Sequence, residues 1–308
     1  MTIREIVLLC HGKAKKGTDD ITRPLKSKSK RQAQKLGAWM REQGIVPDVS
    51  LASPAERALV TAQKALKAGG WTAQHIVTDL RLYEAPVAGH LEALRDQASA
   101  RMLCVGHPKA LTDVLRHLAP DGPALGHGTL ARLSLSDGVL RAGAARVEQV
   151  VAAEDLPDGF AYPGPGGTER RARPAYYYTQ SAALPYRHRG GVLEVLLITS
   201  GSGQKWGIPK GICEPGLTAQ ASAAQEALEE AGVEGKVYPN SVGRYELVKW
   251  GATCSVDIYP MAVTRLLPDS ERDESHRHRM WLPQDKAAAR VDHPDLARII
   301  ASFTAPTE

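Results

Sequence analysis

At 308 residues the chain exceeds the usual size of a single hydrophobic core, so its length predicts two domains. Hydrophobic residues make up 43% and charged residues 24%, which is typical of a soluble globular protein, and no apolar run is long enough to span a bilayer. The formal net charge of +5 suits a small polyanionic substrate, although charge alone also permits nucleic acid. The four cysteines are scattered and form no CxxC pair, which excludes a disulfide framework and a thiolate zinc site.

The first half of the chain alternates short apolar runs with helical patterns, as α/β sheet domains do. The strand-like runs lie at residues 3–9, 49–52 and 101–105, and the helical patterns that follow them at residues 29–43, 55–66 and 111–118. Polar residues come after these strands, namely His11, Ser53 with Arg57, and His107. Because the carboxyl ends of parallel strands meet in one crevice, we expect these side chains to share a site.

Residues that break helices and strands crowd the segment 154–174. This composition predicts a Pro/Gly-rich linker between one domain at residues 1–153 and another at residues 175–308, with no internal repeat across it. In the second domain, strand character is strong at residues 176–179, 192–199, 256–263 and 279–282. A clear helix is predicted at residues 219–231, between a Thr218 cap and Gly232, and a final helix at residues 295–302.

Three glutamates on the predicted helix 219–231 carry the strongest chemical signal. At about 100° per residue, Glu229 and Glu230 lie at roughly −60° and +40° from Glu226, so all three carboxylates share one face. Such crowding is tolerable when cations share the site, and hard oxygen ligands of this kind select Mg2+ or Mn2+. Bound ions would polarise a phosphoryl oxygen and lower the pKa of a bound water. Without further context, a glutamate-rich helix face is ordinarily a solvated one.

The tract from Gly211 to Val233 supplies that context, because it resembles the Nudix box, G-x5-E-x7-R-E-U-x-E-E-x-G-U with U apolar. The spacing is kept, and the matching positions are Gly211, Glu226, Ala227, Glu229, Glu230, Gly232 and Val233. Leu217 replaces the first Glu and Gln225 replaces the Arg; both charges are absent together, so neither is left without its partner. Gln225 can still hydrogen-bond a neighbouring carboxylate.

The Nudix resemblance implies a fold and a role for each matching residue. The fold is an α/β/α sandwich with a mixed sheet, and the activity is that of a pyrophosphohydrolase acting on acid anhydrides. Glu226, Glu229 and Glu230 are expected to be catalytic, and together with Gly211 they are the expected ligands of Mg2+ or Mn2+.

The loop before the Nudix box bears on the substrate. Its order Trp206-x-x-Pro209-Lys210-Gly211 is similar to that of Nudix enzymes acting on dinucleoside polyphosphates and of MutT-type enzymes. Lys210 is expected to meet a phosphate and Trp206 to stack on a base, the alternatives being a solvent-facing cation and a core aromatic residue. Nucleoside or dinucleoside polyphosphates are therefore the expected substrates. Diphosphoinositol polyphosphates are the alternative, since several basic residues could contact many phosphates: Arg187, His188, Arg189 and the stretch 272–279.

Four ordered segments of the first half, at residues 8–14, 20–25, 52–61 and 105–107, resemble the histidine phosphatase superfamily, specifically its SixA-type members. The resemblance implies an α/β sandwich in which His11 is the nucleophile and Arg57 and His107 clamp the phosphoryl oxygens. Cys10 stands where the family has an Arg, so we expect a weakened phosphatase or a phospholigand-binding regulatory module. Lys13 and Arg23 are expected to keep the pocket cationic and to bind phosphate.

The whole chain is thus expected to be a two-domain phosphoanhydride hydrolase. The apolar run at residues 6–9 is too short for a signal peptide, which favours a cytoplasmic location. The expected partner is a small-molecule polyphosphate, and neither a membrane nor nucleic acid is expected. The basic tract at residues 26–31 fits an ordinary solvated helix start. The sequence leaves the oligomeric state and the number of metal ions open.

Overall fold

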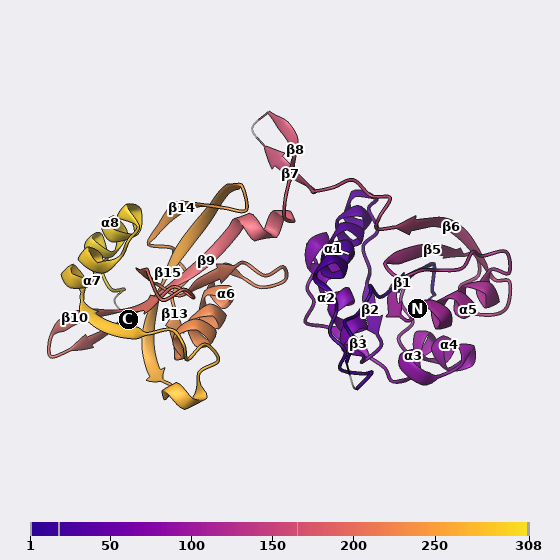
Figure 1. The fold of residues 1–308 in the computed structure, drawn as a ribbon, viewed down its shortest axis with the longest axis horizontal. Coiled ribbons are helices and arrows are strands. Elements are labelled where there is room, and N and C mark those ends of the chain that lie inside the picture. Colours follow the sequence, from indigo (N-terminus) through magenta and orange to yellow (C-terminus); the bar gives the residue numbers. More distant parts are fainter. Residues whose placement is uncertain (1, 18, 165, 307–308) are drawn as a thin grey trace. The chain divides into compact units, whose positions relative to one another are not determined.

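The computed structural model describes residues 2–17, 19–164 and 166–306 of the chain. Two compact units account for them, Met1–Arg170 and Arg171–Glu308. Figure 1 shows helices and strands mixed in both units. Each unit has its own sheet and its own apolar core, so each is described by itself.

The first unit is built on a six-stranded sheet in its described part, with the strand order β3-β2-β4-β1-β5-β6. The strands β1 to β4 pair in parallel, whereas β5 and β6 run antiparallel at one edge. The elements are β1 (Glu5–Cys10), α1 (Ser27–Glu42), β2 (Val49–Ala52), α2 (Glu56–Gly69), β3 (Ile76–Thr78), α3 (Arg81–Glu84), α4 (Val87–Asp96), β4 (Arg101–Gly106), α5 (Pro108–Leu118), β5 (Thr129–Leu135) and β6 (Ala145–Ala152). The expected strand and helix alternation is confirmed.

Helices cover both faces of this sheet, which explains why β1 is apolar from Ile6 to Cys10. Successive side chains of a strand point to opposite faces. Leu8 of β1 lies in the cluster formed with α4 and α5, and Leu9 lies in the cluster formed with α1 and α2. Both leucines are fully buried. The first unit is therefore an α/β sandwich, as its sequence predicts.

The predicted linker at residues 154–174 contains ordered structure. Strands β7 (Phe160–Gly164) and β8 (Gly167–Arg171) form a two-stranded sheet, while Pro165 lies outside the described residues. Phe160 is buried, and the Arg31 guanidinium of α1 lies 5.3 Å from the centre of its ring. The first part of the segment thus packs on the first unit, because a buried aromatic side chain anchors it there. The domain bounds expected from composition stay a prediction.

The second unit has a mixed eight-stranded sheet in its described part, in which β9 and β15 pair in parallel and the other pairs are antiparallel. Its elements are η1 (Ala175–Tyr178), β9 (Thr179–Arg189), β10 (Val192–Thr199), β11 (Trp206–Gly207), β12 (Lys210–Ile212), α6 (Ala219–Glu226), η2 (Ala227–Ala231), β13 (Val233–Val237), β14 (Gly243–Lys249), β15 (Ala252–Leu266), η3 (Asp269–Glu271), β16 (Arg279–Pro283), α7 (Gln284–Arg290) and α8 (Pro294–Ser302). Ala223 of α6 packs on one face of the sheet, and Leu296 of α8 packs on the other. The expected α/β/α sandwich is confirmed.

Two expectations for the second unit need correction. Tyr176–Tyr178, predicted as strand, form a 3-10 turn after Pro174, because Tyr178 is buried and its ring contacts Trp250. The predicted helix at residues 219–231 is α-helical only to Glu226, and the turn Ala227–Ala231 is a π-helix. Its ends lie as predicted: the Thr218 hydroxyl accepts the Ala221 N–H, and Gly232 has a positive φ of 62°.

None of the helices in residues 2–17, 19–164 and 166–306 is both long and apolar enough to cross a lipid bilayer. The longest, α1, has 16 residues and keeps charged side chains on its outer face. Its inner face packs tightly on α2 at Gly37, where an added Cβ would lie 1.9 Å from the carbonyl oxygen of Ala65. Only glycine permits this approach, because the obstructing atom belongs to the backbone.

A Gly37→Ala substitution is expected to lower the free energy of unfolding of the first unit by about 1–3 kcal/mol, because the added methyl group has to push α1 and α2 apart. Denaturant titration of the full chain, followed by a probe in this unit, measures the loss. Lys30→Ala, at an exposed position of the same helix, is the control and should change stability by less than about 0.5 kcal/mol. Equal stabilities of the two variants would contradict the packing described here.

Candidate functional site

The three glutamates of the second unit lie where α6 passes into the π turn. Glu226 ends α6, and Glu229 and Glu230 follow in the turn. The Glu226 carboxylate faces the backbone of Gly211, where an added Cβ would lie 1.9 Å from one carboxylate oxygen. A side chain at position 211 would therefore displace the Glu226 carboxylate, and the loop before the helix comes into direct contact with the acidic face.

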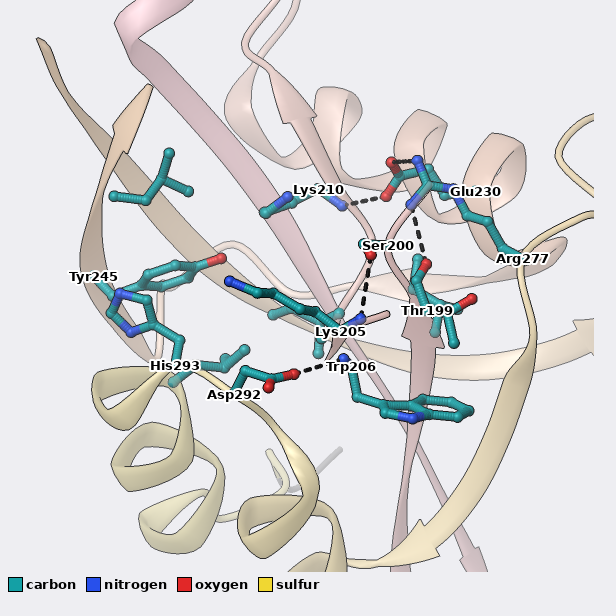
Figure 2. A pocket seen from close by; sticks show the side chains of 15 residues that line it. Thr199, Ser200, Lys205, Trp206, Lys210, Glu230, Tyr245, Arg277, Asp292 and His293 are labelled. Atoms are coloured by element: carbon teal, nitrogen blue, oxygen red, sulfur yellow. Dashed lines mark hydrogen bonds and ion pairs between the residues drawn. The ribbon is translucent and has the colours of Figure 1, made fainter. Parts of the chain in front are cut away.

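The other two carboxylates have partners of their own. Glu230 is buried, accepts the backbone N–H of Lys210 at 2.9 Å and pairs with the Arg277 guanidinium at 2.7 Å (Figure 2). The Gln225 amide donates to Glu229 at 2.7 Å, as expected for a residue that replaces the family's Arg. Each carboxylate of the π turn is thus held by its own partners, Glu230 by Lys210 and Arg277 and Glu229 by Gln225.

Burial and mutual repulsion shape the protonation of this acidic face. Burial, followed by the nearby Glu230 and Glu229, raises the pKa of Glu226 from its ordinary 4.5 to about 7. Burial also raises the pKa of Glu230, against the opposing effects of the Lys210 N–H and Arg277. The pKa of Lys210 is lowered by burial in the same region. A positive charge near Glu226 would relieve the repulsion.

The donor set fits a divalent cation in its chemistry. Carboxylate oxygens and a backbone carbonyl are the ligands that Mg2+ and Mn2+ prefer. Within residues 2–17, 19–164 and 166–306, however, no group of three or more His, Cys, Asp or Glu side chains is arranged to hold a metal ion. Glu230 faces Arg277 and Glu229 faces Gln225, so both would have to turn from these partners to share an ion with Glu226.

A cavity of about 240 Å3 adjoins Glu230. Figure 2 shows Tyr245 and His293 on one side of it, Lys210 and Glu230 on the other, and Lys205 between them. The Tyr245 and His293 rings lie 4.7 Å apart, and apolar side chains complete the lining, namely Ile198, Ile208, Leu247 and Leu296. Aromatic, apolar and cationic groups therefore meet in one cavity.

Trp206, expected to stack on a base, has a different position. Its backbone N–H donates to the Asp292 carboxylate at 2.8 Å, and the Arg290 guanidinium lies 5.3 Å from the centre of its ring. Figure 2 shows the indole pointing away from Tyr245 and His293. The ring packs against the core of the second unit. Trp206 nevertheless lines the cavity, so its expected stacking on a base stays a prediction.

The polar residues that follow the parallel strands of the first unit come together as expected. The Nε2 atom of His11 lies 3.1 Å from Nδ1 of His107, and Nε2 of His107 lies 3.0 Å from the Ser53 hydroxyl. Arg57 Nε donates to Nε2 of His11 at 3.3 Å. Since Nδ1 of His11 lies 2.7 Å from the Gly12 carbonyl and donates to it, Nε2 carries the lone pair. Burial lowers the pKa of His11 to about 3 and that of His107 to about 4, so both imidazoles are neutral at pH 7.

Asp20 accepts hydrogen bonds from the donor side chains that lie beside these histidines. Its carboxylate accepts from Arg57 at 2.7 Å, from Arg23 at 2.8 Å and from the Tyr83 hydroxyl at 2.9 Å. These bonds, that of Tyr83 foremost, lower the pKa of Asp20 to about 2. Three donors that converge on one carboxylate are also arranged to bind an oxyanion.

Cys10 is fully buried and belongs to the apolar cluster on the α4 and α5 face of the sheet. Burial raises the pKa of its thiol to about 12, which makes it inert as a nucleophile. Cys10 therefore provides no cation at the position where the family has an Arg.

A second cavity, of about 370 Å3, lies over His11 in the first unit. Lys13, Arg23 and Arg57 line it, as does His127, whose Nδ1 lies 3.2 Å from the His11 carbonyl. Sequence reasoning placed Lys13 and Arg23 here. It missed His127 and Tyr83, for which no local motif exists, and it assigned Lys26, which also lines this cavity, to a solvated helix start.

In the second unit, sequence reasoning found Gly211, Lys210 and the glutamates but missed most of the cavity beside them. Lys205, Tyr245, Asp292 and His293 come from separate segments and carry no shared pattern. Arg277 was named only as a member of the basic stretch 272–279.

Comparisons with known families and proteins agree with the two motifs. The NUDIX domain model matches residues 179–303, and the model of the histidine phosphatase superfamily (branch 1) matches residues 6–88. Nudix hydrolase 16, mitochondrial, of Arabidopsis thaliana is 34% identical over 113 residues, which are 34% of this chain and 62% of that protein. Nudix hydrolase 21, chloroplastic, of the same plant is 33% identical over 146 residues, which are 44% of this chain and 70% of that protein.

Two of the solved structures that the chain matches have TM-scores below 0.5. The protein histidine phosphatase SixA complexed with tungstate is 19% identical, with a TM-score of 0.44, and the match covers 50% of this chain and 99% of that one. The Ap4A hydrolase of C. elegans is 21% identical, with a TM-score of 0.34 and coverages of 40% and 92%. From the family models and the curated relatives we conclude that this chain belongs to the Nudix hydrolase family and carries a histidine phosphatase module before its Nudix domain.

Proposed function

We propose that the Nudix domain hydrolyses a phosphoanhydride bond in nucleoside or dinucleoside polyphosphates, with Mg2+ or Mn2+ held by Glu226, Glu229, Glu230 and the Gly211 carbonyl. The observation that carries the proposal is the Glu226 carboxylate, which is half-buried against the Gly211 backbone among like charges. A group with a raised pKa in such a place suits a cation ligand.

The residues around the acidic face supply the rest of the chemistry. The bound ion would polarise a phosphoryl oxygen and acidify a water. Lys210 and Lys205 line the adjacent cavity and are placed to neutralise phosphate oxygens. Arg277 lines the same cavity and pairs with Glu230, and its Nη1 donates to the Thr199 carbonyl at 3.1 Å. The chain thus contributes charge neutralisation and orientation, on which phosphoryl transfer chiefly depends.

The cavity favours a nucleotide over a diphosphoinositol polyphosphate. Tyr245 and His293 offer ring faces, and their apolar neighbours suit the flat face of a base. An inositol ring that carries a phosphate on nearly every carbon would need cations on all sides, and this lining lacks them. We therefore place the base beside Tyr245 and His293, and the phosphates toward Lys210.

Of the five arginines expected to serve the inositol alternative, three are engaged elsewhere, namely Arg187, Arg272 and Arg279. Arg187 pairs with Glu194 and stacks on Trp281, with its guanidinium 4.1 Å from the ring centre. Arg272 is buried and donates to the carbonyl of Arg277 at 2.8 Å, and Arg279 donates to that of Leu267 at 2.6 Å. Bonds of this kind stabilise the loop before β16 and leave few donors for a ligand.

For the histidine phosphatase module we propose phosphoryl binding with slow turnover. The Nε2 lone pair of neutral His11 lies between Arg57 and His107, which suits a nucleophile. The missing cation at Cys10 is expected to cost on the order of 10² to 10³ in rate. A purely regulatory module is the alternative. The cytoplasmic location stays a prediction.

A Glu226→Gln variant is expected to lose metal-dependent hydrolysis by a factor on the order of 10² or more, because a neutral amide binds a hard cation weakly. Phosphorus NMR of a panel of dinucleoside polyphosphates, nucleoside triphosphates and inositol pyrophosphates, each with Mg2+ or Mn2+, reports the substrate and the bond that is cleaved. Glu271→Gln, an exposed glutamate, is the matched control. Full turnover by Glu226→Gln would refute the assignment of the site.

Without metal, the Glu226→Gln protein is expected to be more stable than the wild type at pH 8 and to lose this advantage at pH 5. The folded-state pKa of about 7 lies above the ordinary 4.5, so the folded protein binds the proton more tightly, and wild-type stability falls as the pH rises between these values. The fall amounts to at most about 3 kcal/mol. Denaturant titrations in EDTA at both pH values measure it, with Glu271→Gln as the control; a stability difference that does not vary with pH would contradict the raised pKa.

Incubation with phosphoramidate is expected to place a phosphoryl group on His11 slowly. The P–N bond of the donor breaks and ammonia leaves, while a bond forms from phosphorus to Nε2 of His11. Mass spectrometry at neutral pH measures the added mass, and His11→Ala serves as the control because it lacks the nucleophile. If the wild type takes up no phosphoryl group although phosphate binds, the module is a binding module only.

A further inference from the structure

Two lysines face each other across a short backbone pairing at the mouth of the first unit's cavity. Ala14 and Leu25 form an antiparallel bridge, the Lys26 N–H donates to the Lys13 carbonyl at 3.1 Å, and the Lys15 N–H donates to the Pro24 carbonyl at 2.8 Å. This register places Lys13 directly opposite Lys26. Both side chains line the cavity, so they lie on the same side of the pairing.

This arrangement is electrostatically unfavourable in the free protein. Like charges directly opposite each other on paired strands repel. Neither Lys13 nor Lys26 has an ion pair with a carboxylate among residues 2–17, 19–164 and 166–306, and no Asp or Glu of that part lines the cavity. An anion bound between the two ammonium groups would turn the repulsion into attraction.

The residues that line the cavity occupy two depths. His11 and Arg57 are 4% and 6% exposed and form the inner end, whereas Lys13 and Lys26 are exposed and form the mouth. Arg23 is half-buried and lines the cavity as well. At about 370 Å3 the cavity is much larger than one phosphoryl group. A single phosphoryl group at the inner end would leave the two lysines uncompensated.

We propose that this cavity is a diphosphate site. His11 and Arg57 receive the terminal phosphoryl group, which takes the place of the Asp20 carboxylate on the Arg57 guanidinium. Lys13 and Lys26 receive the phosphate linked to it. The ligand class is a compound that ends in two linked phosphates, such as pyrophosphate or a nucleoside diphosphate, rather than a monophosphate ester. The proposal rests on the phosphoryl binding proposed for this module and does not depend on the function of the Nudix domain.

The test compares pyrophosphate with orthophosphate on the full chain in EDTA, which keeps metal from the Nudix domain. Binding is followed by NMR through the ring signals of His11, identified by their absence in a His11→Ala spectrum. The signals of a ring at the inner end report this cavity and not the Nudix cavity. The variants are Lys13→Gln/Lys26→Gln and, as a control with the same change of net charge, Lys28→Gln/Lys30→Gln at exposed positions outside the cavity.

The wild type is expected to bind pyrophosphate at least about tenfold more tightly than orthophosphate, because charge-assisted hydrogen bonds from two lysines are added. The Lys13→Gln/Lys26→Gln variant should lose most of this preference and keep its orthophosphate affinity within a few-fold, while the control keeps the preference. Melting curves establish that each variant is folded, which is expected because all four lysines are exposed.

Four results would overturn the proposal. The first is equal affinity of the wild type for the two anions, and the second is a preference for pyrophosphate that survives in Lys13→Gln/Lys26→Gln. The third is an equal loss of that preference in the control, which would indicate only the long-range field of the basic segment. The fourth is that the His11 signals shift with neither anion. Hydrolysis by the Nudix domain can succeed or fail independently of each of these results.

Discussion

The contact between the Gly211 backbone and the Glu226 carboxylate is the constraint on which the Nudix site depends. Strand β9 fixes both sides of this contact. Its Ser181 pairs with Gly211 across the sheet, and the hydroxyl of Ser181 donates to the Ala219 carbonyl in the first turn of α6. Ser181 is fully buried, so one short side chain holds the loop and the helix in register. A side chain at position 211 would push the Glu226 carboxylate out of this contact.

The opposite end of the acidic helix is held just as closely, by an arginine that the Nudix pattern does not contain. Arg272 is buried beside Gly232 and donates to the carbonyl of Arg277, which brings the loop before β16 under the π turn. Gly232 thus serves two purposes, since it has a positive φ and leaves room for the Arg272 side chain. The π turn is therefore held by Gln225, which bonds Glu229, and by Arg272 in this loop.

The sequence predicts the parts of both sites that lie in contiguous motifs. In such a motif, the spacing of residues along a helix or at a strand end determines the direction in which each side chain points. Glu226 and Gly211 are examples, and so are His11 and His107 at the ends of parallel strands. Tyr245 and His293 could not be predicted, since each depends on the packing of α8 against β14 rather than on its own neighbours in sequence. The π turn after Glu226 could not be predicted either, because nothing in an Ala- and Glu-rich sequence marks the change from α-helical to π-helical hydrogen bonds.

With Cys10 where the family has an Arg, the cations of the phosphatase module lie at the mouth of its cavity and at Arg57. The Cys10 thiol belongs to the apolar cluster on one face of the sheet, while Lys13 and Lys26 lie at the mouth of the cavity. Attraction of a distant anion depends on the summed field, so mouth cations maintain binding. Stabilisation of a transition state depends on donors that touch the reacting group, and there Arg57 has to act without the missing residue. Affinity and rate are therefore decoupled in this module, because they are set by cations at different depths.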